Sequence, residues 1–319
     1  MADGSTLSVI GALIGNLAVA GVKTFAWMAS GSSAMLTEAI HSLVDTLNQL
    51  LPLLGLHQGR KPADESHPFG HGMEVYFWTF IVALLIFAMG GALGIWEGLQ
   101  KLKHPAPVSH VWLNLAVIAV SGVIEAASLW VSLSAARKTA SPLLRRIVPT
   151  LSFIQLMHTS KDPGIYEALA ENSAAVLGLV FATLGVIGSA WFGWRHADAI
   201  ASMAIGVLLV AVAGYLVIET RSLLTGEAAG PPVIAEIRRI LEEDSRVAEV
   251  CAIQSMHLGP QNILVAATLD FNDHLTVPEV ETAADELTRN LQKVEPRITQ
   301  VFIRPGKAAV SDGALRTVS

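Results

Sequence analysis

Charged residues are scarce in this 319-residue chain: Asp, Glu, Lys and Arg make up 15% of it, against about 25% in a typical soluble domain. The net charge of −6 leaves no basic excess to hold nucleic-acid phosphates. The single cysteine, Cys251, excludes a disulfide framework and a thiolate metal cluster. A GxxxxGK[ST] loop and a nucleophile–base arrangement are also missing. We therefore expect no nucleic acid, no ATP, no organic cofactor and no enzymatic activity.

The few charges are unevenly distributed along the chain. Residues 1–225 hold 12 Lys+Arg and 13 Asp+Glu, whereas the much shorter stretch 226–319 holds 9 and 14. This division predicts an α-helical membrane protein with a transmembrane domain at 1–225, a small cytoplasmic α/β domain at 226–305 and a disordered tail at 306–319.

Six stretches are long and apolar enough to cross a bilayer, which takes about 20 residues each. They are 7–29, 33–56, 76–99, 112–136, 165–190 and 199–219. The first lacks a charged leader and a cleavage motif, so we expect a span rather than a removable signal. Because six is even, both termini should lie on the same side of the membrane.

Lysine and arginine are concentrated in the connections on one side of these spans. One side holds three of them, Lys101, Lys103 and Arg195. The other side holds eight: Arg60, Lys61, Arg137, Lys138, Arg145, Arg146, Lys161 and Arg221. Because cytoplasmic loops carry the excess of positive residues, both termini are predicted to be cytoplasmic.

Residues 226–305 have the pattern of a small α/β unit. Pro231 opens an amphipathic helix, and strand-like runs follow at 247–257 and 262–271. Thr276 with Glu279 has the form of a capping box at the start of a second helix, and a last strand is expected at 298–304. The order αββαβ predicts a ferredoxin-like sheet backed by two helices. Dimerisation would help such a small core.

Polar side chains recur at helical spacing inside two spans. The 33–56 span carries Glu38, His41, Asp45 and Asn48 on one stripe. His41 and Asp45 lie one turn apart and could bind one ion, with an oxygen from Glu171 in the 165–190 span. Imidazole with carboxylates suits Zn²⁺, Fe²⁺, Co²⁺ or Mn²⁺. The alternative is a buried hydrogen-bond network that only orients the helices.

A second group of potential ligands lies between the second and third spans. Asp64, His67 and His71 offer three metal-compatible side chains within eight residues. The same loop contains a His-Pro-Phe-Gly turn, so a purely structural role is the alternative.

Two stretches resemble the cation diffusion facilitator family of divalent metal transporters. One is GSSAMLTEAIHSLVDTLN at 31–48, and the other is HPFGHG at 67–72. SKDP at 160–163, followed by LAENSAAVLG at 169–178, is similar to the branch that includes the animal mitochondrial zinc transporter and its bacterial relatives. The resemblance covers the chain from about residue 7 to 305.

The resemblance implies a homodimeric antiporter that exports a divalent metal, zinc first, in exchange for protons. His41 and Asp45 match the family's first ligand pair, and Glu171 falls at the first position of the second pair. Ala175 stands where most members have Asp. The fourth ligand would then be Asn48, Asn172, Ser173 or water. A non-transporting metal sensor or scaffold is the alternative function.

The resemblance also bears on the loop and the tail. Asp64, His67 and His71 match the spacing of a regulatory zinc site that some members carry in this loop. The tail is similar to the family's metallochaperone-like domain, where His257 is present but the last strand, VFIRP at 301–305, lacks a His or Asp pair. We therefore expect the tail to dimerise by packing rather than through a zinc cluster.

Overall fold

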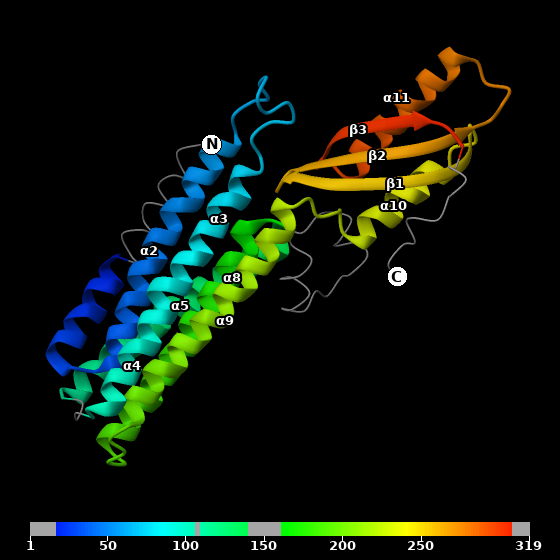
Figure 1. Cartoon of the computed structure of the whole chain (residues 1–319). Coiled ribbons are helices and arrows are strands. Elements are labelled where there is room, and N and C mark those ends of the chain that lie inside the picture. The colour runs from blue at the N-terminus through cyan, green and yellow to red at the C-terminus, as the bar shows by residue number, and fades with distance from the viewer. Residues whose placement is uncertain (1–16, 106–108, 140–160, 308–319) are drawn as a thin grey trace.

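A computed structural model describes residues 17–105, 109–139 and 161–307, except for the side chains of 47–49, 52, 138 and 139. Long helices lie alongside one another, and a small sheet with two further helices sits at one end of them (Figure 1). We call the end of the bundle nearest this sheet the inner end, and the opposite end the outer end.

The bundle helices follow the apolar stretches of the sequence. An initial helix, Leu17–Ser30, precedes α2 (Ser33–Gly59). A single long helix comprises α3 (Glu74–Leu85), the π-helical turn η1 (Ile86–Ala92) and α4 (Leu93–Lys103). The last three are α5 (Val111–Thr139), α8 (Pro163–Ala190) and α9 (Ala197–Leu224). Within the described residues, four helices have the length and hydropathy of a membrane span: Glu74–Lys103, Val111–Arg137, Pro163–Ala190 and Ala197–Leu224.

Helix starts are fixed by local capping side chains. Ser32 caps α2 by accepting a hydrogen bond from the backbone N–H of Met35 at 3.2 Å. Asp162 caps α8 by accepting from Gly164 N at 3.1 Å, and Pro163 takes the first helical position. Both arrangements satisfy backbone donors that a helix start leaves without partners.

Glycines allow α9 to lie close to the long helix formed by α3, η1 and α4. A Cβ atom at Gly206 would meet the backbone of Ile95 and Gly91, and one at Gly91 would meet Val210. Small residues at such crossings let helix backbones approach within a membrane. The π-helical turn at Ile86–Ala92 lies at this crossing.

Asp198, at the start of α9, ties the outer ends of three helices together. Its carboxylate is buried and accepts hydrogen bonds from Ser33 N and Ser33 Oγ, both at 2.8 Å, and from Ser32 Oγ. Lys101 Nζ at the end of α4 lies 3.2 Å from Asp198 Oδ2. One carboxylate therefore joins the start of α2, the end of α4 and the start of α9.

The α/β unit that follows α9, called the soluble unit below for its higher share of charged residues, has the expected element order. It contains α10 (Pro231–Glu242), β1 (Val247–Gly259), β2 (Asn262–Phe271), α11 (Val277–Val294) and β3 (Ile298–Pro305). The sheet order is β1-β2-β3, with β1 antiparallel and β3 parallel to the central strand. Alternate β2 residues pack with α10 and α11 in one core, so both helices cover the same face. The predicted tail beyond residue 307 lies outside the described residues.

The capping box predicted at the start of α11 is confirmed. Thr276 N and Thr276 Oγ1 both donate to Glu279 Oε2, at 2.7 and 2.8 Å. These bonds lower the pKa of Glu279, because they favour its ionised form.

Gly206→Ala should destabilise the bundle, because a methyl group would press on the backbone of the long helix. Overpacking of this kind costs about 1–3 kcal/mol, more than the gain in helix propensity. Gly214→Ala is the matched control, since a Cβ there meets nothing within 4 Å. Thermal unfolding of the purified protein in detergent should give a lower midpoint for Gly206→Ala only. Equal midpoints for the two variants would contradict the close approach of α9.

Candidate metal sites

His41 and Asp45 form a buried pair on α2. His41 Nε2 lies 3.6 Å from Asp45 Oδ2, and 2% of the histidine side chain is exposed. Two ligands of one tetrahedral Zn²⁺, each about 2.0–2.1 Å from it, lie about 3.3 Å apart. The pair is thus close to ligand spacing. Both ring nitrogens of His41 and the Oδ1 atom of Asp45 lack a hydrogen-bond partner among the described residues. A hydrogen-bond network that only orients the helices would leave fewer buried polar atoms without partners.

A contact between Glu38 and Gly178 sets the register of α2 against α8. A Cβ at Gly178 would collide with Glu38 Oε1, so the carboxylate occupies the space that the glycine leaves. The helices are antiparallel: α2 begins beside Asp198 at the outer end. Lys161, just before α8, lies at the inner end, 3.6 Å from Glu219 near the end of α9.

This register predicts where Glu171 lies relative to the His41–Asp45 pair. Seven residues toward the inner end lead from Glu38 to Asp45 on α2 and from Gly178 to Glu171 on α8. Seven residues are about two helical turns, so each step returns to nearly the same helix face. We therefore expect Asp45 and Glu171 to lie at the same level of the bundle. The same counting puts the buried Ala175 level with His41.

The other suggested ligands are placed differently. The Asn172 amide donates to Ser132 Oγ on α5 at 2.8 Å, and the Ser173 hydroxyl donates to the Leu169 carbonyl at 2.6 Å. The Asn48 side chain lies outside the described residues, so its role stays a prediction.

From the sequence, Glu167 is expected to be solvated by water, because it lies one turn nearer than Glu171 to the cytoplasmic end of the 165–190 span. It is 4% exposed, and neither of its carboxylate oxygens has a hydrogen-bond partner within the described ranges. That expectation is wrong, because α8 packs against α3 at this level, and Tyr76 and Thr79 on α3 are fully buried. The position of a residue along its helix does not reveal which neighbouring helix buries its side chain.

A buried charge cluster beside the pair was not assigned a role from the sequence. Lys23 on the initial helix donates to Glu38 Oε2 at 3.0 Å and to Ser42 Oγ at 2.8 Å. Its ammonium also lies 3.9 Å from Glu125 Oε1 on α5. The sequence does give one signal, since Glu38 lies on the same stripe as His41 and Asp45.

The loop side chains Asp64, His67 and His71 come together. Their ligand atoms all lie within 4.8 Å of one another. Asp64 Oδ2 is 3.4 Å from His71 Nε2, and Asp64 Oδ1 is 3.5 Å from His67 Nδ1. These separations are close to those between ligands of one Zn²⁺. The donor set of two imidazoles and one carboxylate therefore fits zinc.

Hydrogen bonds prepare Asp64 for a cation. Its carboxylate accepts from Ser66 Oγ at 2.7 Å and from His67 N at 2.7 Å. These bonds lower the pKa of Asp64 to about 2. The carboxylate thus stays ionised at any physiological pH and is always available to a cation. Gly70, with a φ of +85°, supplies the turn that brings His71 back to Asp64.

The loop cluster lies against the soluble unit. A Cβ at Gly72 would collide with the Leu258 carbonyl, and it would come within 3.2 Å of Gly259 Cα at the end of β1. The rings of Phe69 and Phe302 meet edge to face, with centroids 6.4 Å apart. Residues on both sides of His71 therefore touch the sheet.

His257, the remaining potential metal ligand from the sequence, is buried near the end of β1 that contacts the loop. Burial lowers its pKa to about 4, and the nearby Arg297 and Lys161 act in the same direction. Among the residues that the structure describes, the loop holds the one group of three or more His, Cys, Asp or Glu side chains close enough to share a metal ion. His257 does not belong to such a group.

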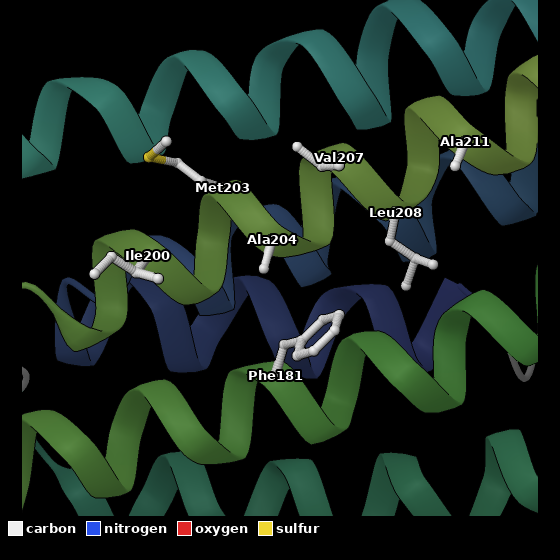
Figure 2. Close-up of a pocket in the computed structure, with 7 residues that line it drawn as sticks. All are labelled: Phe181, Ile200, Met203, Ala204, Val207, Leu208 and Ala211. Atoms are coloured by element: carbon white, nitrogen blue, oxygen red, sulfur yellow. The ribbon is translucent and has the colours of Figure 1, made fainter.

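An apolar groove lies between α8 and α9, with a volume of about 580 Å³. Its lining side chains are all apolar (Figure 2): Phe181, Ile200, Met203, Ala204, Val207, Leu208 and Ala211. With no nitrogen or carboxylate oxygen in its side-chain lining, this groove offers nothing to a metal ion.

Comparison with known proteins decides the family. The sequence profile of the cation efflux transmembrane domain matches residues 9–225. The chain belongs to the cation diffusion facilitator family. The match covers the bundle, the His41–Asp45 pair and the loop cluster, and it makes this an integral membrane protein.

Individual relatives lie at moderate identity. The mitochondrial proton-coupled zinc antiporter SLC30A9 of Xenopus laevis is 33% identical over 250 residues, which are 78% of this chain and 44% of the relative. The human protein of that name is 30% identical over 284 residues, 88% of this chain and 49% of the relative. The cation-efflux pump FieF of Klebsiella pneumoniae is 25% identical over 276 residues, which are 86% of this chain and 84% of the relative. The chain thus spans about half the length of the mitochondrial relatives.

Replacing both loop histidines, His67→Ala with His71→Ala, should remove one bound zinc per protomer. The change leaves a single carboxylate, which cannot hold the ion alone. The matched control is His104→Ala with His274→Ala, since both of those histidines are exposed. Elemental analysis of dialysed protein measures the stoichiometry, and an unchanged zinc content would leave the loop with a structural role.

Proposed function

We propose that this protein is a proton-coupled antiporter that exports a divalent metal cation, zinc first, from the cytoplasm. The carrying observation is the His41–Asp45 pair at ligand spacing, level with Glu171 on the facing helix. The family match and the names of the proton-coupled relatives support it. Iron, cobalt and manganese are the alternative substrates, because the same donor types bind them.

The donor set explains how metal and protons could be linked. A neutral imidazole and two carboxylates balance the charge of one divalent ion. Each of these groups binds protons in competition with the metal, so metal release favours proton uptake and the reverse. Exposing the site alternately to the two sides would then exchange metal for protons. We propose that water takes the fourth position, since Ala175 leaves space level with His41.

The orientation follows from the charges of the connecting segments. We propose six spans, made of the four clear ones together with α2 and the helix that contains Leu17–Ser30. Both termini would be cytoplasmic by the positive-inside rule. The ferredoxin-like soluble unit would then lie in the cytoplasm, and a bacterial inner membrane is the proposed location.

We also propose a homodimer that assembles by packing of the soluble units. The sheet face opposite α10 and α11 carries Met256, Leu264 and Phe302, the last 51% exposed. A partly exposed apolar face on a small domain favours association. The loop cluster at Asp64, His67 and His71 is proposed as a regulatory zinc site of each protomer.

Asp45→Asn should abolish metal-dependent proton flux in sealed vesicles, because it removes a charged ligand and keeps the shape. Glu97→Gln is the control, a carboxylate on α4 outside the proposed site. A pH-sensitive dye inside the vesicles reports the flux. Flux at the wild-type rate in Asp45→Asn would contradict the site. Zinc binding without flux in the wild-type protein would favour a metal sensor over a transporter.

Glu171→Gln should lower metal affinity by at least about tenfold and reduce the number of protons released on binding, because a charge-balancing ligand is lost. Glu167→Gln should change affinity by less than about threefold, although Glu167 is buried, because it lies one turn, about 6 Å, closer to the inner end. Calorimetry in two buffers of different ionisation enthalpy measures both quantities. A larger effect of Glu167→Gln would show that the proposed register is wrong by one turn.

A further inference from the structure

Lys23 is a charged side chain with no exposed surface, inside a bundle that spans a membrane. Its ammonium donates to Glu38 Oε2 and to Ser42 Oγ, and it lies 3.9 Å from Glu125 Oε1. Burying ionised groups in a membrane is costly, so such groups mark functional positions more often than structural ones.

The cluster lies beside the proposed metal site, because Lys23 bonds Glu38, which precedes His41 on α2, and Ser42, which follows it. Glu38 precedes His41 by one turn on α2, toward the end that Asp198 ties down. Lys23 comes from the initial helix, Glu125 from α5, and Gly178 of α8 borders the Glu38 carboxylate. Four helices therefore meet around one ammonium group at this level.

The Lys23 charge also reaches the site itself. Lys23 interacts electrostatically with Asp45, as does Glu38, and the Glu125 carboxylate interacts with both His41 and Asp45. A positive charge so close to Asp45 opposes the binding of a divalent cation there, whereas Glu38 offsets that charge. Glu38 Oε1 has no hydrogen-bond partner among the described residues, so the lysine engages one carboxylate oxygen and leaves the other.

We propose that Lys23 is a tethered cation that opposes the transported metal. Held by Glu38 and Ser42, its ammonium lies beside the site and keeps metal affinity low enough for release. Glu38 acts as its positioning partner and not as a metal ligand. This inference rests on the proposed function, because it takes His41, Asp45 and Glu171 as the metal site.

A double-mutant cycle with shape-conserving changes tests the proposal. The variants are Lys23→Met, Glu38→Gln and the combination of the two, in the full-length protein purified in detergent. The measured quantity is Zn²⁺ affinity by competition with a chelating dye. Asp45→Asn serves as the reference that identifies binding at the proposed site, as opposed to the loop cluster.

The expected result is a pattern of opposite signs. Lys23→Met should tighten Asp45-dependent zinc binding by about tenfold, because an opposing charge is lost. Glu38→Gln should weaken it by about tenfold, because the lysine charge is no longer offset. The combined variant should lie within about threefold of the wild type.

Each other pattern overturns the proposal. A combined variant as weak as Glu38→Gln would make Glu38 a ligand, and weakening in both single variants would make the cluster a structural support. Unchanged zinc affinity in all three variants would show that Lys23 does not oppose the metal. If a Glu38 variant does not fold, Lys23→Met is compared with the charge-keeping Lys23→Arg, and equal affinities contradict the proposal. Zinc binding that is indifferent to Asp45→Asn would instead refute the proposed function, so the two failures are distinguishable.

Discussion

The Glu38 carboxylate against Gly178 is the contact on which the arrangement of the proposed site depends. A glycine at this point lets a charged side chain of α2 lie against the backbone of α8, and so fixes how the two helices align. Because the helices are antiparallel and rise equally per residue, this contact sets which residues are expected to lie at the same level near it. Asp45 meets the level of Glu171, and His41 meets Ala175. The same carboxylate also holds Lys23, so alignment and local charge share a single residue.

Much of this arrangement follows from patterns within single segments. The helical spacing of His41 and Asp45 predicts a shared face, and the loop spacing predicts that Asp64, His67 and His71 converge. Local signals of this kind also predict the element order of the soluble unit and the capping box at Thr276. The ion pair between Lys23 and Glu38 and the burial of Glu167 could not be predicted in this way. Both depend on which helices become neighbours, and hydrophobic periodicity says which residues face inward without naming the neighbour.

The loop cluster connects the bundle and the soluble unit. Phe69 and Gly72 flank His71, and both touch the sheet, the first at Phe302 and the second at the turn after Leu258. An ion held by Asp64, His67 and His71 would stiffen the segment that forms this contact. Lys161 adds a second link, since it lies 2.6 Å from Glu227 in the segment between α9 and α10. The soluble unit is therefore attached to the bundle at two places outside the direct chain connection.

The hydrogen bonds around Asp198 give the two ends of the bundle different stiffness. At one end a buried carboxylate joins the starts of α2 and α9 and the end of α4. At the other end the helices are held by a loop and by an ion pair that is partly exposed to water. Breaking the buried carboxylate network costs more than breaking a hydrated pair. We therefore expect the helices to separate more easily at the inner end, with the Asp198 network at the outer end acting as the hinge.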